Sequence, residues 1–260
     1  MKRKIIITTV SCIVLFSAVA CQAQWTIQGI TWLAANSNFE ENPSQGTGRV
    51  WGDNFNTRFY GLTAKRELGG GFDAELGGNF GDMLKNRMYL DSTANFTDFS
   101  GMIWQVKLMG GYSLVKTSRF ILRLSAGCEY LDILKNFYDH TISGQIVAPG
   151  NWGSYAAVYR GFSAGATGGI RIFNGIGIMA GAWGSPYLLN STAVSGMEEY
   201  STLGRSYAFE GKLKYSAPKG LAVFAGYRYQ KYYFEGDDQD SFYDLDINYG
   251  GPVLGLDWGF

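Results

Sequence analysis

The last nine residues of the chain, Pro252–Phe260, read PVLGLDWGF and decide the fold. Leucine, tryptophan and phenylalanine occupy alternate positions, from Leu254 to Phe260, and glycine or aspartate occupies the positions between them. A period of two is the signature of a β-strand with two unlike faces. The rest of the sequence decides whether this apolar face meets a protein core or a membrane.

The same alternation recurs along the chain. In Phe120–Tyr130 the even positions are apolar, whereas Arg123 and Glu129 stand at odd positions. Such stretches reach about ten residues, roughly twice the usual length of a soluble strand and close to the ~9–11 residues that cross a bilayer at a tilt. We expect ten strands, at residues 25–35, 55–66, 71–81, 101–114, 119–132, 156–172, 175–186, 204–216, 220–234 and 242–260.

The connections between these strands alternate strictly between long and short. The long ones are residues 36–54, 82–100, 133–155, 187–203 and 235–241. The short ones have turn chemistry and include Phe173-Asn174-Gly175 and Pro218-Lys219-Gly220. This pattern is typical of outer-membrane barrels, which have long loops outside, short periplasmic turns and periplasmic termini.

The first residues predict export. Lys2, Arg3 and Lys4 precede an apolar stretch, and cleavage is expected after Ala20 or Ala23. A lipoprotein box ending at Cys21 is the alternative, but it lacks the usual leucine. We therefore divide the chain into a signal peptide, residues 1–23, and a barrel, residues 24–260.

Composition agrees with this division. Glycine accounts for 36 residues and aromatic side chains for 16% of the chain, and both suit a barrel with tight strand packing and aromatic girdles. The barrel is slightly acidic once the signal is removed, so we expect no nucleic-acid partner. Cys128 would be the only cysteine left, which excludes an internal disulfide.

The terminal strand also resembles the C-terminal recognition signal of bacterial outer-membrane proteins, with Phe260 facing lipid. That resemblance implies an all-β, multi-pass barrel in the outer membrane of a Gram-negative-type envelope. The partners implied are membrane lipid, lipopolysaccharide and the barrel-assembly machinery. Upstream of Gly250–Pro252 the apolar residues move from even to odd positions, as at Ile247 and Tyr249. This change predicts a β-bulge at Gly250–Pro252.

Charged residues on the less apolar strand faces are expected to fill the lumen. Because both signs are present in nearly equal number, we expect ion pairs and a plugged interior instead of a wide pore. A narrow channel or a proton-linked function is the alternative. The expected lumen residues are Asp73, Glu75, Lys107, Arg123, Glu129, Arg171, Glu210, Lys212, Lys214, Arg228 and Asp257.

Two loop regions hold candidate chemistry. Asp139 and His140, the only histidine, are adjacent, so a productive catalytic pair needs a turn between them. Asp237, Asp238 and Asp240 form an acidic rim, with Asp244 and Asp246 further along the chain. This spacing lacks the glycine and glutamate of calcium loops, so we expect no metal and no cofactor, although a contact with divalent cations or lipopolysaccharide stays open.

The segment from Asn79 to Ser92, which contains Gly81-Asp82-Met83, resembles the second outer loop of the omptins, ten-stranded outer-membrane proteases. In that family two catalytic aspartates follow, one residue apart, and their positions fall on Lys85 and Arg87 in this chain. The family's second pair, an aspartate and a histidine in the fourth loop, has only Glu198 and Glu199 as counterparts. The resemblance therefore implies the fold without the protease machinery.

From these features we expect a non-enzymatic surface protein whose outer loops bind an extracellular ligand or partner. Candidate binding residues are the cations Lys85 and Arg87 and the acidic rim, beside aromatic loop residues such as Trp51, Trp152 and Tyr155. An omptin-like or lipid-directed hydrolase using Asp139 and His140 is one alternative, and a narrow small-solute channel is another.

Overall fold

The computed structural model describes residues 24–41, 49–52, 55–92, 95–194, 200–235 and 244–260. The predicted signal peptide, residues 1–23, lies outside the described residues. Among those described, no helix has the length and apolar character needed to cross a membrane.

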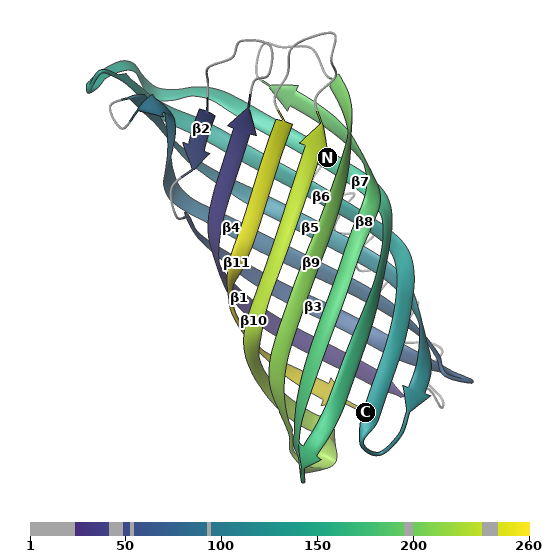
Figure 1. The fold of residues 1–260 in the computed structure, drawn as a ribbon. Helices are drawn as coiled ribbons and strands as arrows, with labels where there is room; N and C mark the ends of the chain where they lie inside the picture. Colours follow the sequence, from purple (N-terminus) through teal and green to yellow (C-terminus); the bar gives the residue numbers. More distant parts are fainter. Residues whose placement is uncertain (1–23, 42–48, 53–54, 93–94, 195–199, 236–243) are drawn as a thin grey trace, which may run out of the picture.

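Ten long antiparallel strands wrap into a barrel, tilted against its axis (Figure 1). The barrel closes where β1 pairs with β11, with Thr26 opposite Gly259. This confirms the predicted ten-stranded all-β barrel; an eleventh, short strand, β2 (Arg49–Gly52), pairs with β1 and β4 at one end. The long strands are β1 (Trp25–Glu41), β3 (Phe55–Gly69), β4 (Phe72–Ser92), β5 (Asn95–Lys116), β6 (Phe120–Ile142), β7 (Gln145–Phe173), β8 (Ile176–Val194), β9 (Tyr200–Ser216), β10 (Leu221–Glu235) and β11 (Asp244–Gly259).

At the outer end the strands run much further than the sequence indicated. Residues 133–155, expected as a long loop, continue β6 and β7 and join through the two-residue turn Ser143-Gly144. Both turn residues have positive φ, 51° and 78°, as a type I′ hairpin turn requires. The hairpin continues because its backbone groups pair across the two strands, which satisfies them without water.

The predicted β-bulge at Gly250–Pro252 is wrong. The register of β11 against β10 is continuous, with Gly250, Gly251 and Pro252 opposite consecutive residues of β10. Ile247, Tyr249 and Val253 all face inward and are buried. The apolar parity changes along β11 because the barrel interior changes from polar to apolar, and not because the strand turns over.

The outward face of the barrel carries an apolar band. On β6, Leu122 and Leu124 are exposed, and the band ends at Tyr130 and the charged Asp132. On β11 it extends to Trp258 and Phe260, whose rings lie 5.3 Å apart near the end with the short turns. Such a band, edged by aromatic residues on a closed barrel, is the surface of a membrane-spanning protein.

Candidate functional site

A continuous cluster of buried apolar side chains, which we call the plug, fills much of the barrel interior, mainly in its outer half. It draws on eight of the ten long strands described, including β1, β6 and β11. Its members are Trp32, Ala34, Phe59, Phe99, Ile103, Leu131, Ile133, Tyr159, Leu188, Phe224, Tyr232, Ile247, Tyr249 and Val253. Apolar side chains in contact across the lumen exclude water from the space that they fill.

Aromatic rings organise the centre of the plug. Trp32 and Phe59 stack with centroids 4.6 Å apart, and Tyr249 meets Phe59 edge-on at 5.3 Å. The neighbouring strand makes room for these rings at Gly81, where an added Cβ would lie 2.6 Å from the Phe59 ring. Glycine at this position therefore allows β4 to pass close to the plug.

The inner half of the lumen is polar and braced by ion pairs. Arg123 on β6 reaches Asp73 on β4, with 2.5 Å between Nη2 and Oδ1 and 2.9 Å between Nε and Oδ2. The same guanidinium lies 3.1 Å from Glu75, and Lys65 lies 3.3 Å from Asp73. Two cations and two carboxylates thus share one network, in which Asp73 and Arg123 are buried and Lys65 and Glu75 are half-buried.

A second group surrounds Glu129. Its carboxylate accepts hydrogen bonds from Gln105 at 2.6 Å and from Ser185 at 3.3 Å, and it lies 3.4 Å from Lys107 Nζ. Tyr232 donates to the same carboxylate at 3.4 Å. Tyr232 belongs both to this group and to the plug, so the group lies directly beneath the plug.

A third group lies on β9, β10 and β11. Glu210 pairs with Lys212 at 2.7 Å and is 4.0 Å from Arg228. Asp257 pairs with Lys214 at 2.5 Å and accepts a hydrogen bond from Gln28 at 2.7 Å. The contacts of Asp257 thus connect β11 to β9 and to β1 inside the lumen.

Between these groups a cavity of about 410 Å³ occupies the inner half of the lumen. Its wall extends from Thr26 and Glu67, near the end with the short turns, to Lys107, Trp183 and Arg228 beneath the plug. The cavity, which we call the cup, therefore reaches from the end with the short turns to the base of the plug.

Several charged positions differ from the expected lumen set, among them Arg171 and Lys65. Arg171 has the inward parity but lies exposed beside the turn that joins β7 and β8. Lys65 was not among the expected lumen residues, although it shares its strand face with the buried Phe59 and Thr57. That parity is the signal that could have identified it.

Asp139 and His140 lie on β6, in the hairpin beyond the membrane. Asp139 has a φ of 49° at a register shift, and its Oδ1 accepts a hydrogen bond from the backbone N–H of Gly150 at 2.8 Å. His140 is half-buried opposite Ala148. Within the described ranges, no three His, Cys, Asp or Glu side chains gather as a metal site would require.

The remaining candidates are only partly described. Lys85 lies at a register shift in β4, and Arg87 pairs with Asp98 of β5 through the backbone. Trp51 lies on β2, and Trp152 and Tyr155 lie on β7. Asp244 and Asp246 belong to β11. Asp237, Asp238 and Asp240 lie outside the described residues, as do Glu198 and Glu199.

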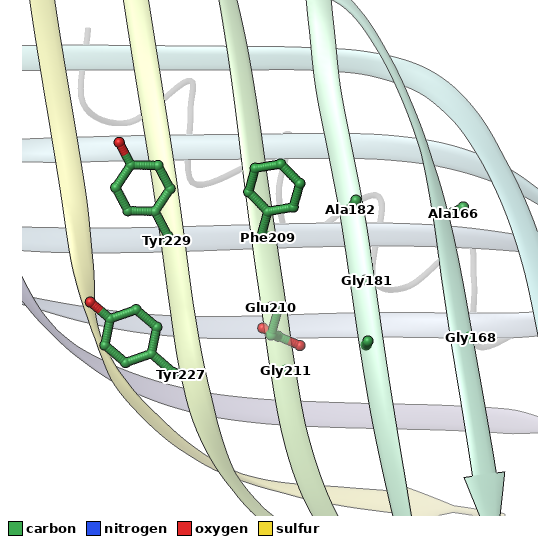
Figure 2. A pocket seen from close by; sticks show the side chains of 10 residues that line it. Ala166, Gly168, Gly181, Ala182, Phe209, Glu210, Gly211, Tyr227 and Tyr229 are labelled. Atoms are coloured by element: carbon green, nitrogen blue, oxygen red, sulfur yellow. The ribbon is translucent and has the colours of Figure 1, made fainter.

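A second hollow, of about 510 Å³, lies on the outward face of β7 to β10 (Figure 2). Small residues, among them Ala166, Ala182 and Gly211, form its floor, and the rings of Phe209 and Tyr227 rise beside them. Because these residues share the outward face with the apolar band, the hollow faces lipid chains.

Comparison with solved structures shows what this fold is similar to. The outer membrane protease OmpT from Escherichia coli matches with a TM-score of 0.73 at 11% identity, over 93% of this chain and 98% of that one. A major outer membrane protein from Thermus thermophilus matches with a TM-score of 0.42 at 10% identity, over 92% of this chain and 100% of that one. The translocator domain of the autotransporter NalP from Neisseria meningitidis also gives 0.42, at 11% identity, over 92% of this chain and 89% of that one.

No family model matches the sequence, and no curated protein matches it either. The likeness to OmpT is one of fold, because identity is low while almost all of both chains superpose. The apolar band on the outside of the closed barrel indicates independently that the protein spans a membrane. The chain is a closed, membrane-spanning β-barrel with the fold of that protease.

Proposed function

We propose that this chain is a non-enzymatic surface protein whose outer rim binds a protein partner. The observation that carries the proposal is the tip of the β6–β7 hairpin. Ile142, Ile146 and Val147 are 44%, 60% and 53% exposed there. The tip lies about 30 Å along the strand beyond Asp132, where the apolar band ends, at ~3.3 Å per residue. Apolar side chains gathered in water favour burial against another molecule.

Three further features support binding over transport or catalysis. The plug obstructs the lumen, which argues against a solute channel. The Asp139 carboxylate is engaged by the backbone of Gly150, which suits a structural role in the hairpin. Lys85 and Arg87 stand at the positions of the omptin aspartates, where carboxylates would be needed to activate water.

The barrel wall has partners of its own in this proposal. Arg160 and Arg205 are exposed on the outward face near the outer edge of the band, where they suit contact with lipopolysaccharide phosphates. The C-terminal strand ending in Phe260 is proposed as the contact for the barrel-assembly machinery, on the resemblance of its sequence to that signal.

The test uses the refolded barrel, residues 24–260. We expect no steady conductance in planar bilayers and no turnover of a peptide library or of lipopolysaccharide, with a His140→Ala variant beside it. On an array of extracellular proteins, binding should fall at least about tenfold when Ile142, Ile146 and Val147 are all replaced by serine, since each buried apolar side chain contributes ~1.5–3 kcal/mol.

A Gln145→Ser variant is the matched control, because Gln145 is an exposed polar residue of the same tip. It should bind as the parent does. Turnover that disappears in His140→Ala would replace the proposal with a hydrolase. Steady conductance would replace it with a channel, and array binding equal in the triple variant would remove the hairpin tip from the binding surface.

A further inference from the structure

The upper end of the inner cavity gathers hydrogen-bond donors that have no acceptor. Lys107 Nζ, Trp183 Nε1 and Arg228 Nε are buried, and none has a hydrogen-bond partner among the described residues. All three side chains line the cavity wall beneath the plug. We call them the donor cluster.

The two cations of the donor cluster share one aromatic ring. The Arg228 guanidinium lies 4.8 Å from the Trp183 ring centroid and Lys107 Nζ lies 5.2 Å from it. Arg228 also lies 5.2 Å from the Trp32 ring, at the base of the plug. The aromatic faces stabilise the positive charges, but they offer no oxygen or nitrogen acceptor to the N–H groups.

The neighbouring carboxylates do not supply what the donors need. Glu129 already accepts from Gln105, Ser185 and Tyr232, and its contact with Lys107 is an ion pair at 3.4 Å without hydrogen-bond geometry. Glu210 pairs with Lys212 at 2.7 Å and stays 4.0 Å from Arg228. Arg228 therefore keeps a free donor on a side chain that is only 8% exposed.

Lysine, arginine and tryptophan side chains are donors only, so the group that completes such a cluster must be an acceptor. An unmatched buried donor costs about 1–3 kcal/mol, and more when it is charged. An oxyanion supplies several acceptors at once and also neutralises positive charge, which a water molecule cannot do.

We propose that the donor cluster binds a small oxyanion, a carboxylate or phosphate group, that enters the cup from the periplasm. The cavity reaches the exposed Glu67 beside the periplasmic turns, and the plug fills the lumen at its other end. The ligand therefore binds and leaves by the same route, so the site serves binding and not passage. It is independent of the hairpin tip and of any partner outside the cell.

The test follows the Trp183 indole N–H by NMR in the refolded, ¹⁵N-labelled barrel, with the signal assigned through Trp183→Phe. Sodium phosphate and sodium acetate are titrated separately against sodium chloride at constant ionic strength. We expect a saturable shift with at least one oxyanion and none with chloride. Lys107→Gln and Arg228→Gln should each raise the apparent Kd about tenfold or more, as expected for a charged hydrogen bond.

Two further variants separate binding from general effects. Lys116→Gln removes an exposed cation at the periplasmic rim and should leave the Kd unchanged. Arg228→Lys keeps the charge but removes the planar donor, so it should weaken binding less than Arg228→Gln. Folding is checked by the heat-dependent mobility of each variant on gels. The proposal would be overturned if neither oxyanion gave a saturable shift. It would also be overturned if folded Lys107→Gln and Arg228→Gln bound the oxyanion with the same Kd as the parent.

Discussion

Asp73 on β4 and Arg123 on β6 form a two-pronged ion pair although β5 lies between their strands. The side chains are 3% and 10% exposed. The pair thus spans a neighbouring strand inside the lumen and connects three consecutive strands independently of the backbone ladder.

Asp73→Asn should destabilise the barrel by about 2–4 kcal/mol, because among the described residues it leaves the buried Arg123 with Glu75 as its one close anion. Equilibrium urea unfolding in lipid vesicles measures this change. The control is Lys116→Gln, which breaks the exposed pair with Glu67 and should cost less than about 1 kcal/mol. Equal costs for the two variants would mean that the buried pair stabilises the barrel no more than the exposed pair does.

Gly111→Ala should destabilise the barrel by about 1–3 kcal/mol, since an added Cβ would overlap both Arg123 and Asp73. Gly110→Ala is the matched control on the same strand. Its Cβ would meet nothing nearer than a backbone oxygen at 3.8 Å, so its unfolding curve should stay close to the parent's. The two variants are compared by the same urea unfolding, and a tolerated Gly111→Ala would show that the ion pair can shift.

Phe59→Ala should cost about 3–5 kcal/mol, because it opens a hole in the centre of the plug beside Trp32 and Tyr249. Tyr60→Ala removes the next aromatic ring on the same strand, which is 50% exposed and faces outward. It should cost less than half as much. A larger effect at Tyr60 than at Phe59 would place the main stabilising contacts on the lipid face.

Ala166→Arg should destabilise the folded barrel by about 2–4 kcal/mol, since the residue lies on the floor of the lipid-facing hollow. Val158→Arg lies on the same face of β7, beyond Arg160 and towards the outer end, where the cost should be about 0–1 kcal/mol. Unfolding in vesicles of defined thickness measures both. Similar costs would mean that the membrane reaches beyond Arg160.

Much of the fold could be predicted from the sequence because lipid imposes a strong alternation. Leu254, Leu256 and Trp258 show it clearly, and turn chemistry such as Asn174-Gly175 located the short connections. The plug could not be found this way. Where both faces are apolar, as at Ile103 between Met102 and Trp104, alternation disappears and the inward residue cannot be distinguished. The same effect led to the mistaken bulge in β11.

The candidate site was harder to predict than the fold. Parity places Lys107 and Arg228 on inward faces, but it says nothing about which partners they meet across the lumen. The approach of both cations to Trp183 depends on the radius and stagger of the closed barrel. Asp139 illustrates a different limit, because its positive φ belongs to a hairpin that resembled a loop in sequence.

The pairing of β1 with β11 has a consequence in time. Trp25 and Phe260 exchange backbone hydrogen bonds of 2.9 and 3.0 Å, so the strands that complete the ring are the first and the last of the barrel to be made. Every contact of this seam joins residues more than two hundred positions apart in the sequence, and closing so long a loop is slow. Until β1 and β11 meet, the sheet has two unpaired edges. Because unpaired edges pair readily with other strands, the interval before this seam closes is the one in which the chain is most prone to aggregate.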